Sequence, residues 1–223
     1  MAEQLLKERD DGVRLIRVHS QDDVLPYRAS FAGAYQTIFS EPPYNERFFP
    51  SEAEAVLQSY LEIAGNISVL AIRGRASVVG FGISVPARSK ADITRELRGL
   101  IPLQHAHYFA EMGVLTQYRG AGLGNDMVAV RLRVIDRQRF THVVLRTSAV
   151  RNASYEMYMR RGFDDMGVYM EVPSRRVDGR VATDRRLFLH KVLSPDDSES
   201  TLDEEASDPE TWLPDGGGFG AGD

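Results

Sequence analysis

The chain of 223 residues contains no cysteine. Disulfide bonds, cysteine-based zinc sites and a cysteine nucleophile are therefore excluded. Long apolar runs are missing as well, since no stretch approaches the roughly 20 residues that a membrane-spanning helix needs. The first eleven residues are rich in charge and lack the apolar run of a secretory signal. These absences predict a cytoplasmic protein without a membrane partner.

Basic residues are missing from the end of the chain. Residues 194–223 contain ten acids, no Lys or Arg, and a glycine-rich terminus, which leaves 22 acids and 27 bases in residues 1–193. A segment with few apolar residues and charge of one sign is typical of disorder. We therefore expect one domain over residues 1–193 and an acidic tail over 194–223. The tail is either a solubilising appendage or, around Trp212, an interaction segment.

Hydrophobic periodicity predicts alternating strands and helices through the domain. Proline-rich residues 40–50 must form a loop, and residues 86–104 form a short flap with helical spacing. The order indicates an α/β fold with a mixed central sheet flanked by helices on both faces. Helices are expected from a cap at Asp22 or Asp23 through Ile38, from a Ser51–Glu54 capping box to Gly65, at 123–134 and at 153–161; strands are expected at 13–18, 67–72, 77–85, 107–115, 142–147, 163–172 and 186–193.

A glycine-rich loop follows the strand that ends near Val114, and an amphipathic helix begins inside it. Free N–H groups and the dipole at a helix start favour an anion such as a pyrophosphate, and glycines let the phosphate approach the main chain. A dinucleotide site is a weak alternative, because the glycines lack the Rossmann spacing and no acidic residue lies near residues 143–147. A P-loop is also a weak alternative, because the sequence has no Gly-Lys-Ser/Thr motif. The remaining alternative is that the loop is a tight turn that binds no ligand. The loop reads Arg119, Gly120, Ala121, Gly122, Leu123, Gly124.

Two segments together resemble the GNAT superfamily of acetyl-CoA-dependent N-acetyltransferases. Residues 110–124 are similar to its pyrophosphate signature, Arg/Gln-x-x-Gly-x-Gly/Ala, and to the fourth strand that precedes it. Residues 152–163 are similar to its Asn followed by Leu-Tyr-x-x-x-Gly-Phe. The resemblance covers about residues 13–193, with the flap at 86–104 outside the common core. It implies a GNAT-like fold and direct acyl transfer from acetyl-CoA.

The resemblance also implies roles for individual residues. Met112, Gly113 and Val114 would pair with the pantetheine arm as with an added strand, and main-chain groups from Arg119 through Asn125 would surround the pyrophosphate. Asn152 would bond to the pantetheine, with Tyr155 and Tyr158 at the same site. Tyr158 would be the general acid near the thioester sulfur. Asn152 precedes Tyr158 by one residue fewer than in many members, which is a departure from the pattern.

Acyl transfer also needs a base that takes a proton from the amine. Glu111 is the candidate base, because it lies on the strand beside the cofactor-binding residues. Side chains alternate along a strand, so Glu111 facing away from the site is the alternative. His107 and Tyr108 are fallback positions. With five histidines and no paired carboxylates, we expect no metal site.

The acceptor should be bound by the least regular segments. Glu41, Tyr44 and Glu46, in the loop after the first helix, suit a cationic amine, and the flap at 86–104 can close over them. The sequence thus predicts an N-acetyltransferase acting on the primary amine of a small molecule. A protein N-terminus or lysine is the alternative acceptor, and an acyl-CoA sensor without turnover is the alternative function. No nucleic-acid partner is expected, since the acidic tail would compete with phosphate; a homodimer is left open.

Overall fold

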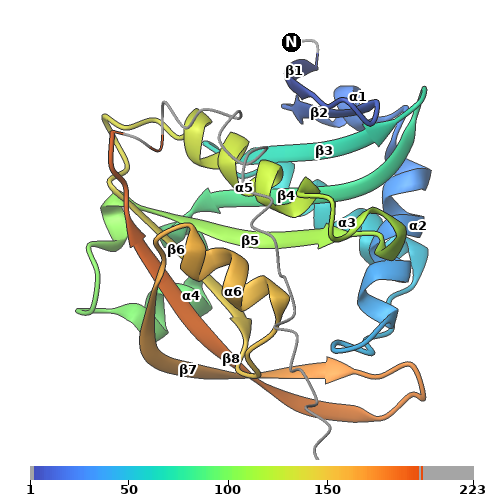
Figure 1. Ribbon diagram of the computed structural model, residues 1–223. Helices are drawn as coiled ribbons and strands as arrows, with labels where there is room; N and C mark the ends of the chain where they lie inside the picture. The colour runs from blue at the N-terminus through green and yellow to red at the C-terminus, as the bar shows by residue number, and fades with distance from the viewer. Residues whose placement is uncertain (1–2, 196, 198–223) are drawn as a thin grey trace, which may run out of the picture.

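The computed structural model describes residues 3–195 and 197, so the acidic tail and Trp212 lie outside the described residues apart from the tail's first positions. One eight-stranded sheet runs through the protein in the order β1-β2-β3-β4-β5-β6-β8-β7 (Figure 1). Neighbouring strands are antiparallel except β5 and β6, which are parallel. The strands are β1 (Gln4–Glu8), β2 (Val13–Val18), β3 (Ile67–Arg73), β4 (Ser77–Pro86), β5 (Ala106–Val114), β6 (His142–Ser148), β7 (Asp164–Arg175) and β8 (Val181–Val192).

Helices cover both faces of the sheet. On one face lie α1 (Gln21–Val24), α2 (Arg28–Ser40), α3 (Pro50–Leu61) and α4 (Ala91–Leu97), and on the other α5 (Leu123–Val134) and α6 (Ala153–Arg160) (Figure 1). This arrangement confirms the predicted α/β fold with a mixed sheet between helical layers. None of the described helices combines the length and the apolar character that crossing a bilayer requires.

Each face has its own hydrophobic core. Between the sheet and α2, the rings of Phe31, Tyr35 and Phe81 pack with centroids 5.0 to 5.7 Å apart. Between the sheet and α5, Met127 and Val130 are fully buried. Each fully buried apolar side chain of this size contributes about 1.5–3 kcal/mol. The two cores hold β5 in the middle of the molecule, where both helical layers reach it.

Several element boundaries differ from the sequence-based expectation. The first predicted helix is two helices, because Pro26 cannot continue α1. Ser20 caps α1 in place of Asp22 or Asp23, and Asp23 completes the capping box. The second helix begins at Pro50, which favours a first helical position, and not from a Ser51–Glu54 capping box. It ends at Leu61, short of Gly65.

Two other differences arise from tertiary contacts. Strand β1 was not predicted, because its five residues show no clear alternation and form a strand only by pairing with β2. The strands β7 and β8 are longer than expected and form a hairpin whose ladder ends at the pair Arg175–Val181. Cross-strand contacts stabilise its exposed part, among them Arg185, whose guanidinium lies 3.8 Å from the ring centre of Tyr169.

Strand β5 loses its partner β6 partway along its length. The parallel ladder begins at Ala106 with His142 and stops at Phe109 with Leu145. Beyond Phe109, β5 continues along β4 as far as Val114, while β6 turns away from it (Figure 1). The main chain of residues 110–114 therefore has no strand partner on its β6 side.

The same stretch of β5 carries a β-bulge. Phe109 pairs with Ser84 and Glu111 pairs with Ile83, so Ala110 has no partner of its own on β4. A bulge interrupts the alternation of side chains and redirects those that follow. The bulge therefore determines the face on which Glu111 lies.

Candidate functional site

The glycine loop connects β5 to α5. Gly122 is the N-cap of α5 and has a left-handed backbone with φ 78°, and Gly120 has φ 79°. The first helical bond runs from the N–H of Asp126 to the carbonyl of Gly122 at 2.9 Å. The N–H groups of Leu123 and Gly124, in the first turn, precede any intrahelical acceptor and can face an anion. The predicted start of the helix inside the glycines is confirmed.

Arg119 and Glu41 interact with each other next to this loop. The Nε of Arg119 donates to the carbonyl of Val114 at 2.8 Å, and its guanidinium pairs with the Glu41 carboxylate at 3.0 Å. The hydroxyl of Thr116 donates to the same carboxylate. Glu41 was expected to contact the acceptor amine. Its carboxylate instead binds Arg119 and Thr116, which lie in the segment that precedes the glycine loop.

The N-terminal hairpin contacts the glycine loop as well. Arg9 donates to the carbonyl of Ala121 at 2.6 Å and forms an ion pair with Asp126. Lys7 pairs with the same aspartate at 2.8 Å. Arg9 and Ala121 are 112 residues apart in sequence, so no local pattern could indicate this contact. These two cations neutralise the carboxylate of Asp126 at the start of α5.

Glu111 lies on the face of the sheet that α2 and α3 cover. Its carboxylate accepts hydrogen bonds from the hydroxyls of Tyr60 at 3.3 Å and Tyr35 at 3.4 Å. Burial raises the pKa of Glu111 to about 7, although the nearby Arg146 opposes the rise. A carboxylate with a pKa near neutrality is suited to act as a general base.

Tyr44 and Glu46 approach this group from the loop between α2 and α3. The Arg186 guanidinium lies 5.1 Å from the ring centre of Tyr44 and pairs with Glu46 at 2.7 Å. Burial raises the pKa of Tyr44, Arg186 opposes the rise, and Tyr158 and Glu111 lie close enough to add to it. Tyr44 is therefore near both candidate catalytic residues, whereas Glu46 already has a cationic partner.

Met112 and Tyr158 meet on the opposite face of the sheet. The Tyr158 hydroxyl lies 3.5 Å from the Met112 sulfur, and Nη2 of Arg131 lies 3.0 Å from the same sulfur. Burial raises the pKa of Tyr158, and Arg131 opposes the rise. The sequence-based prediction did not include Arg131 in the site. Its position four residues after Met127 places a charged side chain on the inner face of α5, which could have indicated it.

Three other predicted cofactor residues make protein contacts. The side-chain oxygen of Asn152 caps α6 by accepting from the N–H of Tyr155 at 3.1 Å. The Tyr155 hydroxyl donates to Asp165 at 3.3 Å. The side-chain oxygen of Asn125 accepts from Arg161 at 2.7 Å. The asparagine of the second motif thus has a local structural role as a helix cap, and its contact with the pantetheine stays a prediction.

The two fallback residues lie on different faces. His107 places Nε2 3.1 Å from the carbonyl of Gly65, and burial lowers its pKa to about 4. Tyr108 packs in the core on the Glu111 face, and its hydroxyl has no hydrogen-bond partner within the described residues. Across residues 3–195 and 197, no three His, Asp or Glu side chains gather in a way that could hold a metal ion.

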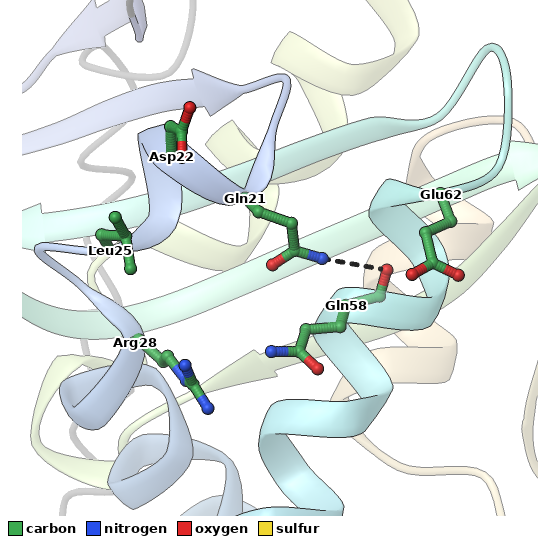
Figure 2. A pocket seen from close by; sticks show the side chains of 6 residues that line it. All are labelled: Gln21, Asp22, Leu25, Arg28, Gln58 and Glu62. Atoms are coloured by element: carbon green, nitrogen blue, oxygen red, sulfur yellow. Dashed lines mark hydrogen bonds between the residues drawn. The ribbon is translucent and has the colours of Figure 1, made fainter.

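Two surface hollows lie outside this constellation. One, of about 340 Å³, lies between α1, α2 and α3, where the Gln21 amide donates to the Gln58 carbonyl at 3.5 Å (Figure 2). Its lining residues are Gln21, Asp22, Leu25, Arg28, Gln58 and Glu62. A second, of about 390 Å³, lies between α2, the start of β4 and Tyr118. Neither includes Glu111 or Tyr158, so the candidate site is defined by the residues around β5.

Comparison with known proteins gives a match at the level of structure only. No family model and no curated protein matches the sequence. The ribosomal-protein-alanine N-acetyltransferase of Brucella melitensis aligns over 79% of this chain and 99% of its own, with 18% identity and a TM-score of 0.54. A GNAT-family acetyltransferase of Streptococcus pneumoniae aligns over 81% and 99%, with 13% identity and a TM-score of 0.53. The NatC complex bound to a Gag peptide and CoA aligns over 81% and 99%, with 14% identity and a TM-score of 0.52.

Proposed function

Because the chain has the fold of the GNAT acetyltransferases, we propose that it moves an acetyl group from acetyl-CoA to the primary amine of a small molecule. One observation carries the proposal: β5 has a free edge after Phe109, where the parallel ladder with β6 stops, and the glycine loop follows that edge in the chain. An extended ligand can add to such an edge through main-chain hydrogen bonds. The start of α5 then receives the anionic end of the same ligand.

The residues along this path fit acetyl-CoA. The backbone of Met112, Gly113 and Val114 would hold the pantetheine arm, and residues 119 to 125 would hold the pyrophosphate. A Cβ added at Gly120 would meet no atom within 4 Å, so the loop leaves open space at that point. Lys7 and Arg9 neutralise Asp126 at the start of α5 and so reduce its repulsion of a phosphate. When bound, acetyl-CoA supplies the acyl group and a thiolate leaving group.

The chain's own residues then divide the proton transfers. Glu111 takes a proton from the amine, because its pKa of about 7 leaves much of it ionised at neutral pH. Tyr158 gives a proton to the departing sulfur. The main chain at Ala110, which has no ladder partner on β4, is the candidate for orienting the carbonyl oxygen. The nitrogen–carbon bond forms as the carbon–sulfur bond breaks, and the bonding pair stays on sulfur.

The surroundings of Glu111 support an amine as the acceptor. The phenol groups of Tyr35 and Tyr60 bond to its carboxylate, and Tyr44 lies nearby. When it is ionised, the Glu111 carboxylate attracts an ammonium, which can then lose its proton to it. A protein N-terminus is the second candidate acceptor, because the Brucella and NatC structures are named as N-acetyltransferases of proteins or complexes with a peptide.

The test is a screen of amines and short peptides with acetyl-CoA, with release of free thiol as the signal. The chain has no cysteine, so every thiol detected comes from CoA. Turnover of a small amine that is lost in Glu111→Gln supports the proposal. Turnover of peptides alone would replace the acceptor with a protein N-terminus. CoA binding without any turnover would make the protein a sensor, and absence of CoA binding would overturn the cofactor assignment.

A further inference from the structure

Two strong hydrogen-bond donors converge on one weak acceptor beside the free edge of β5. Nη2 of Arg131 lies 3.0 Å from the Met112 sulfur, and the Tyr158 hydroxyl lies 3.5 Å from it. A thioether sulfur is a poor acceptor. The guanidinium and the phenol therefore gain little from Met112, and both are placed for a sulfur that carries more negative charge.

Arg131 is a buried charge without a carboxylate partner. Its side chain is 0% exposed, and no ion pair to it occurs among the described residues. Its other contacts are the carbonyl of Met127 at 3.1 Å, the carbonyl of Glu111 at 3.5 Å, the ring of Phe109, whose centre lies 4.1 Å from Cζ, and the hydroxyl of Tyr158. Burial of an unpaired charge costs several kcal/mol. Nearby inward positions of α5 hold apolar residues, so packing alone gives no reason for an arginine.

The neighbouring strand leaves room for this guanidinium. A Cβ added at Gly82 of β4 would lie 2.8 Å from Nε and 2.9 Å from Cζ of Arg131. Any side chain at Gly82 would therefore displace the guanidinium from its position. Gly82 and the ring of Phe109 together fix the charge next to Met112, on the face that carries Tyr158.

We propose that Arg131 is a further catalytic residue whose guanidinium lies against the thioester sulfur and stabilises the negative charge that forms there. This inference rests on the proposed acetyl transfer. The flexible Met112 side chain moves aside for the sulfur of the bound thioester. As the carbon–sulfur bond breaks, its electron pair stays on sulfur beside Arg131. Tyr158 then supplies the proton, and Arg131 gives up none.

The test compares CoA with desulfo-CoA, which lacks only the thiol, in calorimetric titrations from pH 6.5 to 9.5. In the wild-type protein the preference for CoA should grow with pH by about tenfold, which corresponds to a bound thiol pKa lowered by about one unit. Arg131→Met keeps a long side chain and removes the charge. Its affinity for desulfo-CoA should stay within about threefold of the wild-type affinity, and its preference for CoA should no longer increase with pH. The exposed Arg139→Met removes the same charge elsewhere and should behave as wild type.

Two further measurements keep the outcome clear. The ultraviolet absorbance of the bound CoA thiolate, titrated on wild-type protein, should show the lowered thiol pKa without any substitution. Arg131→Met should also lower kcat about 100-fold, as expected for loss of one preorganised donor, with little change in the KM for acetyl-CoA. An unshifted thiol pKa, or an unchanged preference in Arg131→Met, would overturn the role of Arg131 while leaving acetyl transfer intact. Failure of both ligands to bind would instead remove the proposed function.

Discussion

Glu111 and Met112 are adjacent in sequence, and their side chains contact opposite faces of the sheet. Glu111 accepts a hydrogen bond from Tyr35 of α2, whereas the Met112 sulfur lies next to Tyr158 and Arg131 of the helices on the other side. In the proposed reaction, the amine loses its proton on one face and the sulfur departs on the other. The reacting carbon then belongs at the free edge of β5, which both faces can reach.

The first prediction concerns the rate at different pH values. Burial raises the pKa of Glu111 to about 7, so kcat/KM should rise through about pH 7 and level off above it. Glu111→Gln should lower activity about 100-fold or more and remove this dependence. The measurement is the pH–rate profile of both forms with the best amine. A flat wild-type profile between pH 5 and 9 would rule out Glu111 as the base.

The same carboxyl group should affect folding stability. The folded state binds a proton at Glu111 more tightly than the unfolded state does, since the ordinary value is 4.5 and the folded value is about 7. Its stabilising contribution is complete below pH 4.5 and is lost as the pH rises through 7. Glu111→Gln, which stays neutral, should therefore melt at a higher temperature than wild type at pH 8 and at a similar temperature at pH 4.5. Equal melting temperatures at pH 8 would contradict the burial of an ionised Glu111.

Tyr158→Phe separates proton donation from packing. The ring packs edge-on against Phe163 with centroids 5.3 Å apart, and the substitution keeps this contact while it removes the hydroxyl. If the phenol protonates the leaving thiolate, kcat should fall by about 100-fold to 10,000-fold with little change in acetyl-CoA affinity. A rate within a few-fold of wild type would show that Tyr158 is a packed aromatic and no acid.

Gly122→Val tests the phosphate position. Gly122 has φ 78°, and a β-branched residue in this region costs about 1–3 kcal/mol. CoA affinity should fall at least tenfold, because the start of α5 shifts and the added side chain crowds the ligand. Gly99→Val is the matched control, since Gly99 has φ 80° with open space around it and lies in the flap. Equal loss of CoA affinity in both variants would attribute the effect to general strain.

Removal of the acidic tail should have little effect. A chain that ends after Asp197 keeps the ion pair of this residue with Lys191 at 3.3 Å and its hydrogen bond from the N–H of Ser194 at 2.8 Å. We expect the melting temperature and the CoA affinity of this shortened chain to match those of the full chain. A marked fall in melting temperature would show that the region around Trp212 docks on the domain.

Local patterns made part of the molecule predictable. The start of α5 at the glycines follows from backbone chemistry within a few residues, and so do the proline-rich loop and the two strands β3 and β4. Strand β1 was missed because its five residues show no clear alternation and form a strand only by pairing with β2. The break between α1 and α2 lies at Pro26, which cannot continue α1; the prediction of one helix did not take this residue into account.

The structure gives several of the predicted site residues partners that the sequence did not indicate. Glu111 could be proposed from its strand, but its face depended on the bulge at Ala110, which only the ladder with β4 reveals. Glu46 was read as a free acid, yet its partner Arg186 is 140 residues away. Arg131 was overlooked because an arginine on the inner face of a helix has meaning only when the space left by Gly82 is known.

The short ladder between β5 and β6 has a mechanical consequence. Strands β1 to β5 and strands β6 to β8 are joined in the sheet by four residue pairs, from Ala106–His142 to Phe109–Leu145. At this seam, a ligand along the free edge of β5 would add main-chain hydrogen bonds beyond the four pairs. We therefore expect amide hydrogens on both sides of the seam to exchange more slowly when CoA is bound.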